Sequence, residues 1–114
     1  MLIVRKKISN AELKNMAQKI FGSLIKAVVD IEQEIMAVDA ELHADLEEHL
    51  LEVGSQQKNL WGINIYPDKV SEDGWIEFDS MINIRPSAGN TNRGVNDPKI
   101  REQIICVMRK LITP

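Results

Sequence analysis

Apolar residues recur along this chain with two different spacings, and the two spacings predict helices and strands. In residues 13–24, 42–53 and 100–111 the apolar positions lie three and four apart, which is the spacing of one face of a helix. In residues 60–66 and 75–85 apolar and polar residues alternate, which is typical of half-buried strands. The pattern therefore predicts three amphipathic helices and an antiparallel pair of strands, with a further short strand at residues 2–4.

Residues suited to helix ends border two of these segments. Ser9 and Glu12 have the spacing of a capping box, in which the serine accepts from an amide and the glutamate reaches back. Gly22 is placed to end that helix, because glycine tolerates the left-handed conformation. Asp97 followed by Pro98 predicts the start of the last helix, with aspartate as cap and proline in the first turn.

Residues 25–53 allow two interpretations. Val28, Ile31, Ile35 and Val38 continue a spacing of three and four, which would extend one long helix or even a coiled coil. The alternative is a hairpin with strands at 27–32 and 35–41 around a turn at Gln33-Glu34, favoured by the β-branched residues. Against the hairpin, Gln-Glu lacks the glycine or asparagine that tight turns prefer. The periodicity by itself leaves both open.

Four strings of this sequence resemble a known family. Residues 27–32 (AVVDIE), 41–45 (ELHAD), 60–62 (LWG) and 82–86 (INIRP) occur in the order found in a small uncharacterised bacterial protein family, a domain of unknown function. The resemblance implies no activity and transfers no catalytic residue. Members of that family tend to carry glycines near the positions of Asp39-Ala40, which favours the hairpin, although this chain has none there.

These elements together predict a single α+β domain over residues 1–114. The expected architecture is an antiparallel or mixed sheet of about four or five strands packed by three helices. We expect all three helices on the apolar face of the sheet. The opposite face would then be polar, and either solvated or buried in a partner.

The composition indicates which binding partners and which cellular compartment to expect. The chain has 114 residues, of which 44% are hydrophobic and 27% charged, with a formal net charge of −3. An acidic chain with dispersed basic residues is not expected to bind nucleic acid. No apolar stretch reaches the length of a membrane span, and Cys106 is the only cysteine. We therefore expect a cytoplasmic protein with no membrane association.

The polar face of the predicted sheet gathers carboxylates. Clustered carboxylates can hold hard cations such as Mg²⁺ or Ca²⁺, or another cationic ligand. The alternative is a solvated face with cross-strand pairs, which alternation alone would produce. The candidate metal ligands are Asp30, Glu32, Asp39, Glu77 and Asp79, and the same face would carry Asn64, Asn83 and Arg85.

The loop at residues 85–94 is the densest polar segment. Arginines, loop amides and the following helix start can all bind an anion. Its candidate anion-binding residues are Arg85, Asn90, Asn92 and Arg93. The competing interpretation is a structural loop held by its own side chains, and Asp97 would disfavour an anion at the helix start.

Known catalytic motifs are absent from the sequence. His43 and His49 point to different sides of their helix, so they do not form a two-histidine zinc motif. The sequence predicts a non-enzymatic binding or interaction module that forms a homo-oligomer through an open sheet face or edge. The alternative is a small metal-dependent or anion-binding enzyme that uses the carboxylate face or the arginine loop. No cofactor can be named from these residues.

Overall fold

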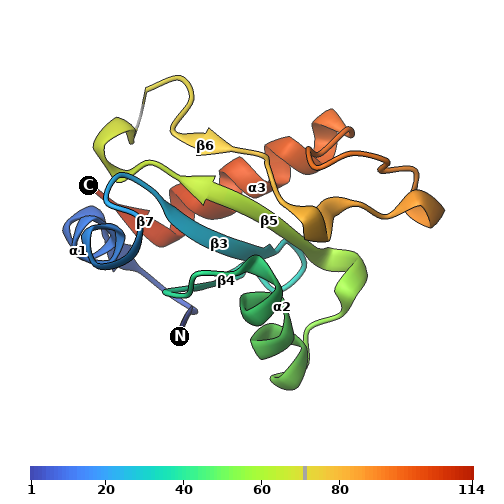
Figure 1. Ribbon diagram of the computed structural model, residues 1–114, viewed down its shortest axis with the longest axis horizontal. Coiled ribbons are helices and arrows are strands. Elements are labelled where there is room, and N and C mark those ends of the chain that lie inside the picture. The colour runs from blue at the N-terminus through green and yellow to red at the C-terminus, as the bar shows by residue number, and fades with distance from the viewer. Residues whose placement is uncertain (71) are drawn as a thin grey trace.

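A five-stranded antiparallel sheet forms the centre of the computed structural model, which describes residues 1–70 and 72–114 (Figure 1). Its strands, in spatial order, are β1 (Leu2–Val4), β4 (Ile35–Val38), β3 (Ile25–Asp30), β5 (Leu60–Ile65) and β6 (Ile76–Glu77). Every neighbouring pair is antiparallel. A second sheet pairs β2 (Ile8–Ser9) with β7 (Ile112–Thr113) in parallel, and so joins the two ends of the chain. The predicted α+β class is confirmed.

Three α-helices accompany the sheet, as the periodicity predicted. They are α1 (Asn10–Ile20), α2 (His43–Glu52) and α3 (Pro98–Leu111). Ser9 Oγ accepts from the Glu12 amide at 3.1 Å, and Asp97 accepts from the Lys99 amide at 2.8 Å, so both predicted caps are present. Gly22 has a φ of 89° just after α1, as expected for a helix stop. Single 3₁₀ turns lie at Gln57–Asn59, Pro67–Lys69, Met81–Asn83 and Pro86–Ala88.

The ambiguous segment is a hairpin of β3 and β4. The turn is longer than the sequence suggested, since Asp30 faces Ile35 and residues 31–34 all lie in the turn. Glu34 takes a φ of 57° and donates its amide to the Asp30 carbonyl at 2.9 Å. The register therefore differs by two residues from a turn centred on Gln33-Glu34. A shift of two keeps each side chain on its face, so the predicted face assignment still holds.

The helices cover both faces of the sheet, which corrects the expectation of one covered face. α1 and α3 pack against the face that carries Ala27, Val29 and Met36. Leu46 and Leu50 of α2 pack on the opposite face, against Val28 and the neighbouring strands. In Figure 1, α2 lies in front of the sheet and α3 behind it. Because both faces are buried, β3 and β4 are apolar at nearly every position, and this is why their pattern also suited a helix.

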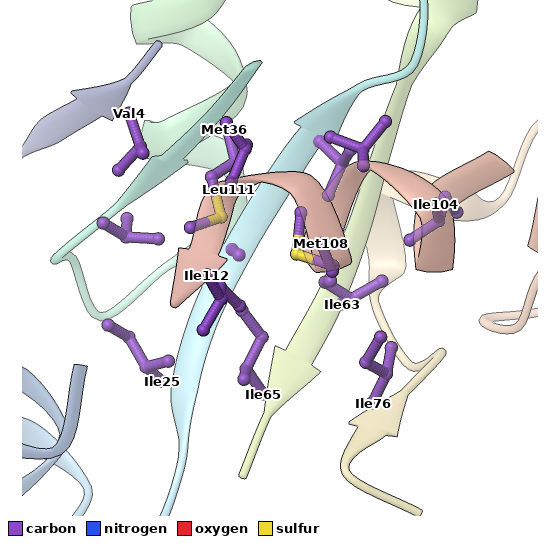
Figure 2. Close-up of a cluster of buried hydrophobic side chains, with 14 of the residues drawn as sticks. Val4, Ile25, Met36, Ile63, Ile65, Ile76, Ile104, Met108, Leu111 and Ile112 are labelled. Atoms are coloured by element: carbon purple, nitrogen blue, oxygen red, sulfur yellow. The ribbon is translucent and has the colours of Figure 1, made fainter. Parts of the chain in front are cut away.

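The larger core lies between the sheet and α3 (Figure 2). Ile104 and Met108 of α3 are fully buried in the same cluster as Ile63 and Ile65 of β5, and Met108 lies beside Ile63 (Figure 2). Cys106 lies on the exposed side of α3.

The predicted strand at residues 75–85 is mostly not a strand. β6 covers only Ile76–Glu77, and a 3₁₀ turn begins at Met81. Alternation placed Ile84 inside and Asn83 outside, whereas Ile84 is exposed and Asn83 is fully buried. The chain leaves the sheet here because it crosses closely over Gly62 of β5. A Cβ at Gly62 would lie 2.6 Å from Ser80 Cβ.

Candidate functional site

Asn83 occupies the edge of β5 that β6 leaves open. Its side-chain amide accepts from Gly62 N at 2.8 Å and donates to Gly62 O at 2.9 Å. The same Nδ2 donates to the Arg93 carbonyl at 3.0 Å. One side chain thus provides the hydrogen bonds that a neighbouring strand would have made. Asn83 was predicted on a polar sheet face, but its role here is structural.

The loop predicted to bind an anion is held together by its own groups. Asn90 is buried and donates to the carbonyls of Asn83 and Gly94, at 2.7 and 2.8 Å. Its Oδ1 accepts from the Asn96 amide at 2.9 Å. The exposed Asn92 accepts from the Gly94 amide and donates to Asn96, both at 2.9 Å. These bonds hold the loop in shape and use the side-chain NH₂ groups of Asn90 and Asn92.

The two arginines of that loop point to different partners. Arg85 donates a hydrogen bond to the Leu60 carbonyl, and its Nη2 lies 3.7 Å from Glu47 Oε2. Its Cζ lies over the Trp61 ring, 4.7 Å from the ring centroid. Burial lowers the pKa of Arg85, against the raising effect of Glu47. Arg93 instead pairs with Asp79 at 2.6 Å. The structure therefore does not bring Arg85 and Arg93 together.

Asp30, a candidate metal ligand, is 1% exposed, and its carboxylate stabilises the β3–β4 turn. Its Oδ1 accepts from the amides of Glu32 and Gln33, both at 2.9 Å. Its Oδ2 accepts from Ser55 Oγ at 2.6 Å and from Gln33 Nε2 at 3.0 Å. The carboxylate thus ties the β3–β4 turn to the chain just after α2.

The other candidate metal ligands are spread over the sheet. Glu32 is exposed in the β3–β4 turn, and Asp39 follows β4 with a φ of 73°. Glu77 lies on β6, and Asp79 follows that strand and pairs with Arg93. Within residues 1–70 and 72–114, no three His, Cys, Asp or Glu side chains are grouped so that they could hold a metal ion. Glu32 contacts Asp30 through its backbone amide, and Glu77 and Asp79 are two positions apart at β6.

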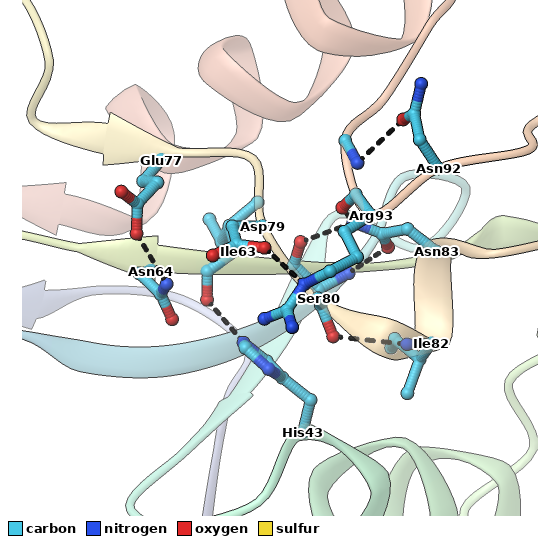
Figure 3. Close-up of polar contacts among 12 residues, drawn as sticks. His43, Ile63, Asn64, Glu77, Asp79, Ser80, Ile82, Asn83, Asn92 and Arg93 are labelled. Atoms are coloured by element: carbon cyan, nitrogen blue, oxygen red, sulfur yellow. Dashed lines mark hydrogen bonds and ion pairs between the residues drawn. The ribbon is translucent and has the colours of Figure 1, made fainter.

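A polar patch does exist where α2 leaves the sheet uncovered (Figure 3). We call it the Asn64 patch, and it contains Lys26, His43, Asn64, Glu77 and the Asp79–Arg93 pair. Lys26, Asn64 and Glu77 are direct partners in register across β3, β5 and β6. Asn64 is buried, and its Nδ2 donates to Glu77 Oε1 at 2.8 Å. The sequence predicted Asn64, Glu77 and Asp79 on one polar face, and the structure keeps these three together.

His43 begins α2, and its ring points toward the sheet and the Ile63 carbonyl (Figure 3). Its Nε2 lies 2.8 Å from the Ile63 carbonyl. A carbonyl can only accept, so Nε2 carries the proton and Nδ1 keeps the lone pair of the neutral ring. Burial lowers the pKa of His43 from 6.5 and outweighs the Ile63 hydrogen bond and Asp79, which raise it, while Lys26 and Arg93 act in the same direction as burial. His43 is therefore a neutral, fixed residue, a role that its surface-like sequence context did not reveal.

A cavity lies between β6 and α3, on the opposite side of the sheet from α2. It measures about 580 Å³, within the range of small-ligand pockets. Its walls are largely apolar, and charged residues stand at its rim. Its lining includes Trp75, Ile76 and Phe78 from the β6 region, and Ile105, Met108 and Arg109 from α3. Trp75 is 9% exposed and belongs to the larger core.

Comparison with known proteins identifies the class and not an activity. This is an α+β domain with a two-sided antiparallel sheet, a polar patch that is partly buried, and a cavity beside an edge strand. The family model for a protein of unknown function (DUF5674) matches residues 2–111, and the chain belongs to that family. No curated protein and no solved structure matches significantly. In the part of the chain that the structure describes, the helices are all too short or too polar to span a membrane.

Proposed function

We propose that this protein is a non-enzymatic interaction module that binds an extended peptide segment along β6. The single observation that carries the proposal is the position of the cavity, which borders the outer edge of the sheet. A peptide added there would gain backbone hydrogen bonds from the strand and specificity from a side chain in the cavity.

The backbone of β6 supports this mode of binding. Tyr66 N donates to the Trp75 carbonyl at 2.8 Å, so Trp75 directs its polar groups toward β5. Neighbouring residues of a strand direct their N–H and C=O groups to opposite sides. Ile76 therefore presents its amide and carbonyl away from β5. β6 ends the strand order of the sheet, so no strand of that sheet covers this edge.

The cavity supports an apolar anchor residue on the peptide. Trp75 and Phe78 provide aromatic walls and Met108 an adaptable one, as in many peptide-binding surfaces. Glu72 and Asp73 add two exposed negative charges at the rim, and Arg109 adds one positive charge. We therefore expect an anchor of the size of leucine or phenylalanine, followed by a basic residue next to Glu72 and Asp73.

Selection from a displayed library of random nine-residue peptides would test the proposal. Selected peptides should share an apolar anchor and lose at least tenfold in affinity for Ile105→Glu, which places a charge at the cavity wall. Gln103→Glu is the matched control, because it adds the same charge to the same helix outside this cavity. Equal binding of the peptides to both variants would exclude the cavity.

Methylated peptides would separate strand addition from side-chain binding alone. Replacing backbone N–H groups by N-methyl one at a time should weaken binding at alternate positions, because only alternate amides of an added strand face β6. Tolerance at every position would contradict strand addition.

Self-association is the competing occupant of the same edge. If a second copy adds its own β6 there, light scattering should show a dimer that Ile105→Glu dissociates and Gln103→Glu does not. That result would replace the peptide partner by a homo-oligomer. The enzymatic alternative would have to rely on Glu77 and Asp79, the two neighbouring carboxylates.

A further inference from the structure

We infer that the outer edge of β1 pairs with β1 of a second copy of this chain, which joins two sheets into one. β1 and β6 end the strand order on opposite sides of the sheet, so the inference is independent of the peptide proposal at β6. α2 packs over β3 and β4, and α1 packs against β2 and β3, so both helices leave β1 at the margin. The residues of β1 include no charge and no proline, which are the usual means of blocking an edge strand.

The hydrogen bonds of the sheet determine which residue of β1 faces outward. Ile31 N donates to the Asn59 carbonyl at 3.1 Å, so Ile31 directs its polar groups toward β5. Successive residues of a strand direct these groups to opposite sides, so Val28, three positions earlier, directs its own toward β4. Ala37, the partner of Val28, therefore directs its groups toward β3 and away from Ile3, its partner on β1. The amide and the carbonyl of Ile3 consequently point away from the sheet.

Two copies of β1 fit each other in antiparallel orientation about a two-fold axis at Ile3. Each Ile3 then exchanges both backbone hydrogen bonds with the partner's Ile3, as in a hydrogen-bonded antiparallel pair. Leu2 lies opposite the partner's Val4, and Leu2 is 40% exposed in the single chain, so the pairing covers apolar surface. A two-fold axis gives both copies the same contacts and closes the assembly at a dimer.

The same register brings opposite charges together. Continued by one residue at each end of β1, it places Met1 opposite the partner's Arg5, and both share the face of Ile3 because side chains alternate along a strand. Ile3 packs in the cluster beneath α2, so this is the face on which α2 lies. Met1 lines a shallow hollow with four residues of α2, namely Asp45, Glu48, His49 and Glu52. The partner's Arg5 is thereby placed beside three carboxylates.

A second copy supplies the partner that each set of charges lacks within one chain. Among the residues that the structure describes, Arg5, Lys6 and Lys7 form no ion pair, and neither does Asp45 or Glu48. Arg5 lies at the far end of β1 from the hollow of its own chain, about 13 Å along the strand from Met1. Each copy carries both the basic run and the acidic hollow, so the two-fold axis forms the contact twice. The charges therefore favour a second copy over an unrelated strand as the occupant of this edge.

Charge exchange, followed by light scattering over a range of protein concentrations, tests the inference. Arg5→Glu and Glu48→Lys each place like charges at the contact, and each should weaken the dimer at least tenfold. The double variant restores opposite charges across the axis, so it should dimerise as the original protein does. Lys19→Glu on α1 is the matched control, because it changes the net charge as Arg5→Glu does but lies outside the contact. All three positions are exposed, so the fold should persist, which far-UV circular dichroism checks.

Amide hydrogen exchange, measured by NMR at two protein concentrations, identifies the edge. The amide of Ile3 should exchange freely in the dilute monomer and at least tenfold more slowly in the dimer. Protection of the Ile76 amide instead, with dissociation by Ile105→Glu, would place self-association at β6 and overturn the inference. A monomer at millimolar concentration would overturn it as well, and so would equal dimerisation of all the charge variants. Peptide selection at β6 is a separate measurement, so either proposal can fail alone.

Discussion

The side chain of Asn83 forms hydrogen bonds with both backbone polar groups of Gly62. Its Oδ1 accepts from Gly62 N at 2.8 Å, and its Nδ2 donates to Gly62 O at 2.9 Å. A single amide side chain thereby replaces a length of strand at the edge of β5. The same contact brings the chain at Ser80 so close to β5 that only glycine fits at position 62. The pair explains why the sheet ends where alternation predicted its continuation.

Asn83→Ala should destabilise the protein strongly. It would leave the Gly62 amide and carbonyl buried and unpaired, each at a cost of about 1–3 kcal/mol. We expect a loss of about 3 kcal/mol in the free energy of unfolding, measured by urea denaturation. Asn92→Ala, an exposed amide in the same loop, is the control and should cost less than about 1 kcal/mol. Similar losses for the two variants would contradict the role of Asn83.

Gly62→Ala tests the close approach from the other side. The new Cβ would lie 2.6 Å from both Cβ and Oγ of Ser80, so the crossing segment must shift. We expect a loss of about 1–3 kcal/mol, as for other overpacked sites. Ser80→Gly removes both contacting atoms, so the double variant should lose less than the two single variants combined. Additive losses would mean that the Ser80 contact is not the cause.

Asp30 and Ser55 should be energetically coupled. The 2.6 Å bond between Ser55 Oγ and Asp30 Oδ2 joins the β3–β4 turn to the segment after α2. Asp30→Ala should lower the free energy of unfolding by about 3 kcal/mol, because four donors lose their acceptor. A double-mutant cycle with Ser55→Ala should give a coupling of about 1 kcal/mol or more. A coupling near zero, together with a Mg²⁺-dependent rise in Tm that Asp30→Asn removes, would return Asp30 to a metal site.

His43 should make stability depend on pH. The pKa of His43 is lowered in the folded state. At a pH between that folded-state pKa and 6.5, the unfolded chain therefore binds a proton that the folded protein does not. The contribution of neutral His43 is thus fully present above about pH 6.5 and is lost as pH falls through the folded pKa. His43→Gln should flatten this part of the stability profile, measured by urea unfolding at several pH values. His49→Gln should leave that part unchanged, and a flattening by both variants would assign the effect elsewhere.

Cys106 should react rapidly with a thiol reagent in the native protein. The residue is exposed on α3, on the side away from Ile104 and Met108. We expect native and unfolded protein to label at rates within about tenfold, because access does not limit the reaction. Protection that grows with protein concentration would place this side of α3 in an assembly. Slow labelling that speeds up only on unfolding would show that Cys106 is shielded within the monomer.

Local signals in the sequence predicted the helices well. Ser9 and Asp97 act within three residues of their own position, and the stripe of α3 depends only on helical geometry. The face assignment of Val29 and Met36 also held, because the side-chain period of a strand is two. The carboxylate and arginine-loop sites were less predictable. Whether Asp30 binds a metal ion or stabilises the turn depends on its contact with Ser55, which is 25 positions away in the sequence.

The sequence by itself determined three helical segments, where two of the helices begin, and that residues 25–41 could pair as strands. Only the tertiary structure decided which faces are covered, because α2 could pack on either side of the sheet until its neighbours were placed. Contacts between distant residues decided the end of the sheet as well. Asn83 is buried because Gly62 leaves room for the chain to cross. The sequence around Asn83 gives no sign of that room. The hydrogen bond between Asn64 and Glu77 arises in the same way, because the pairing of β5 with β6 places the two residues opposite each other.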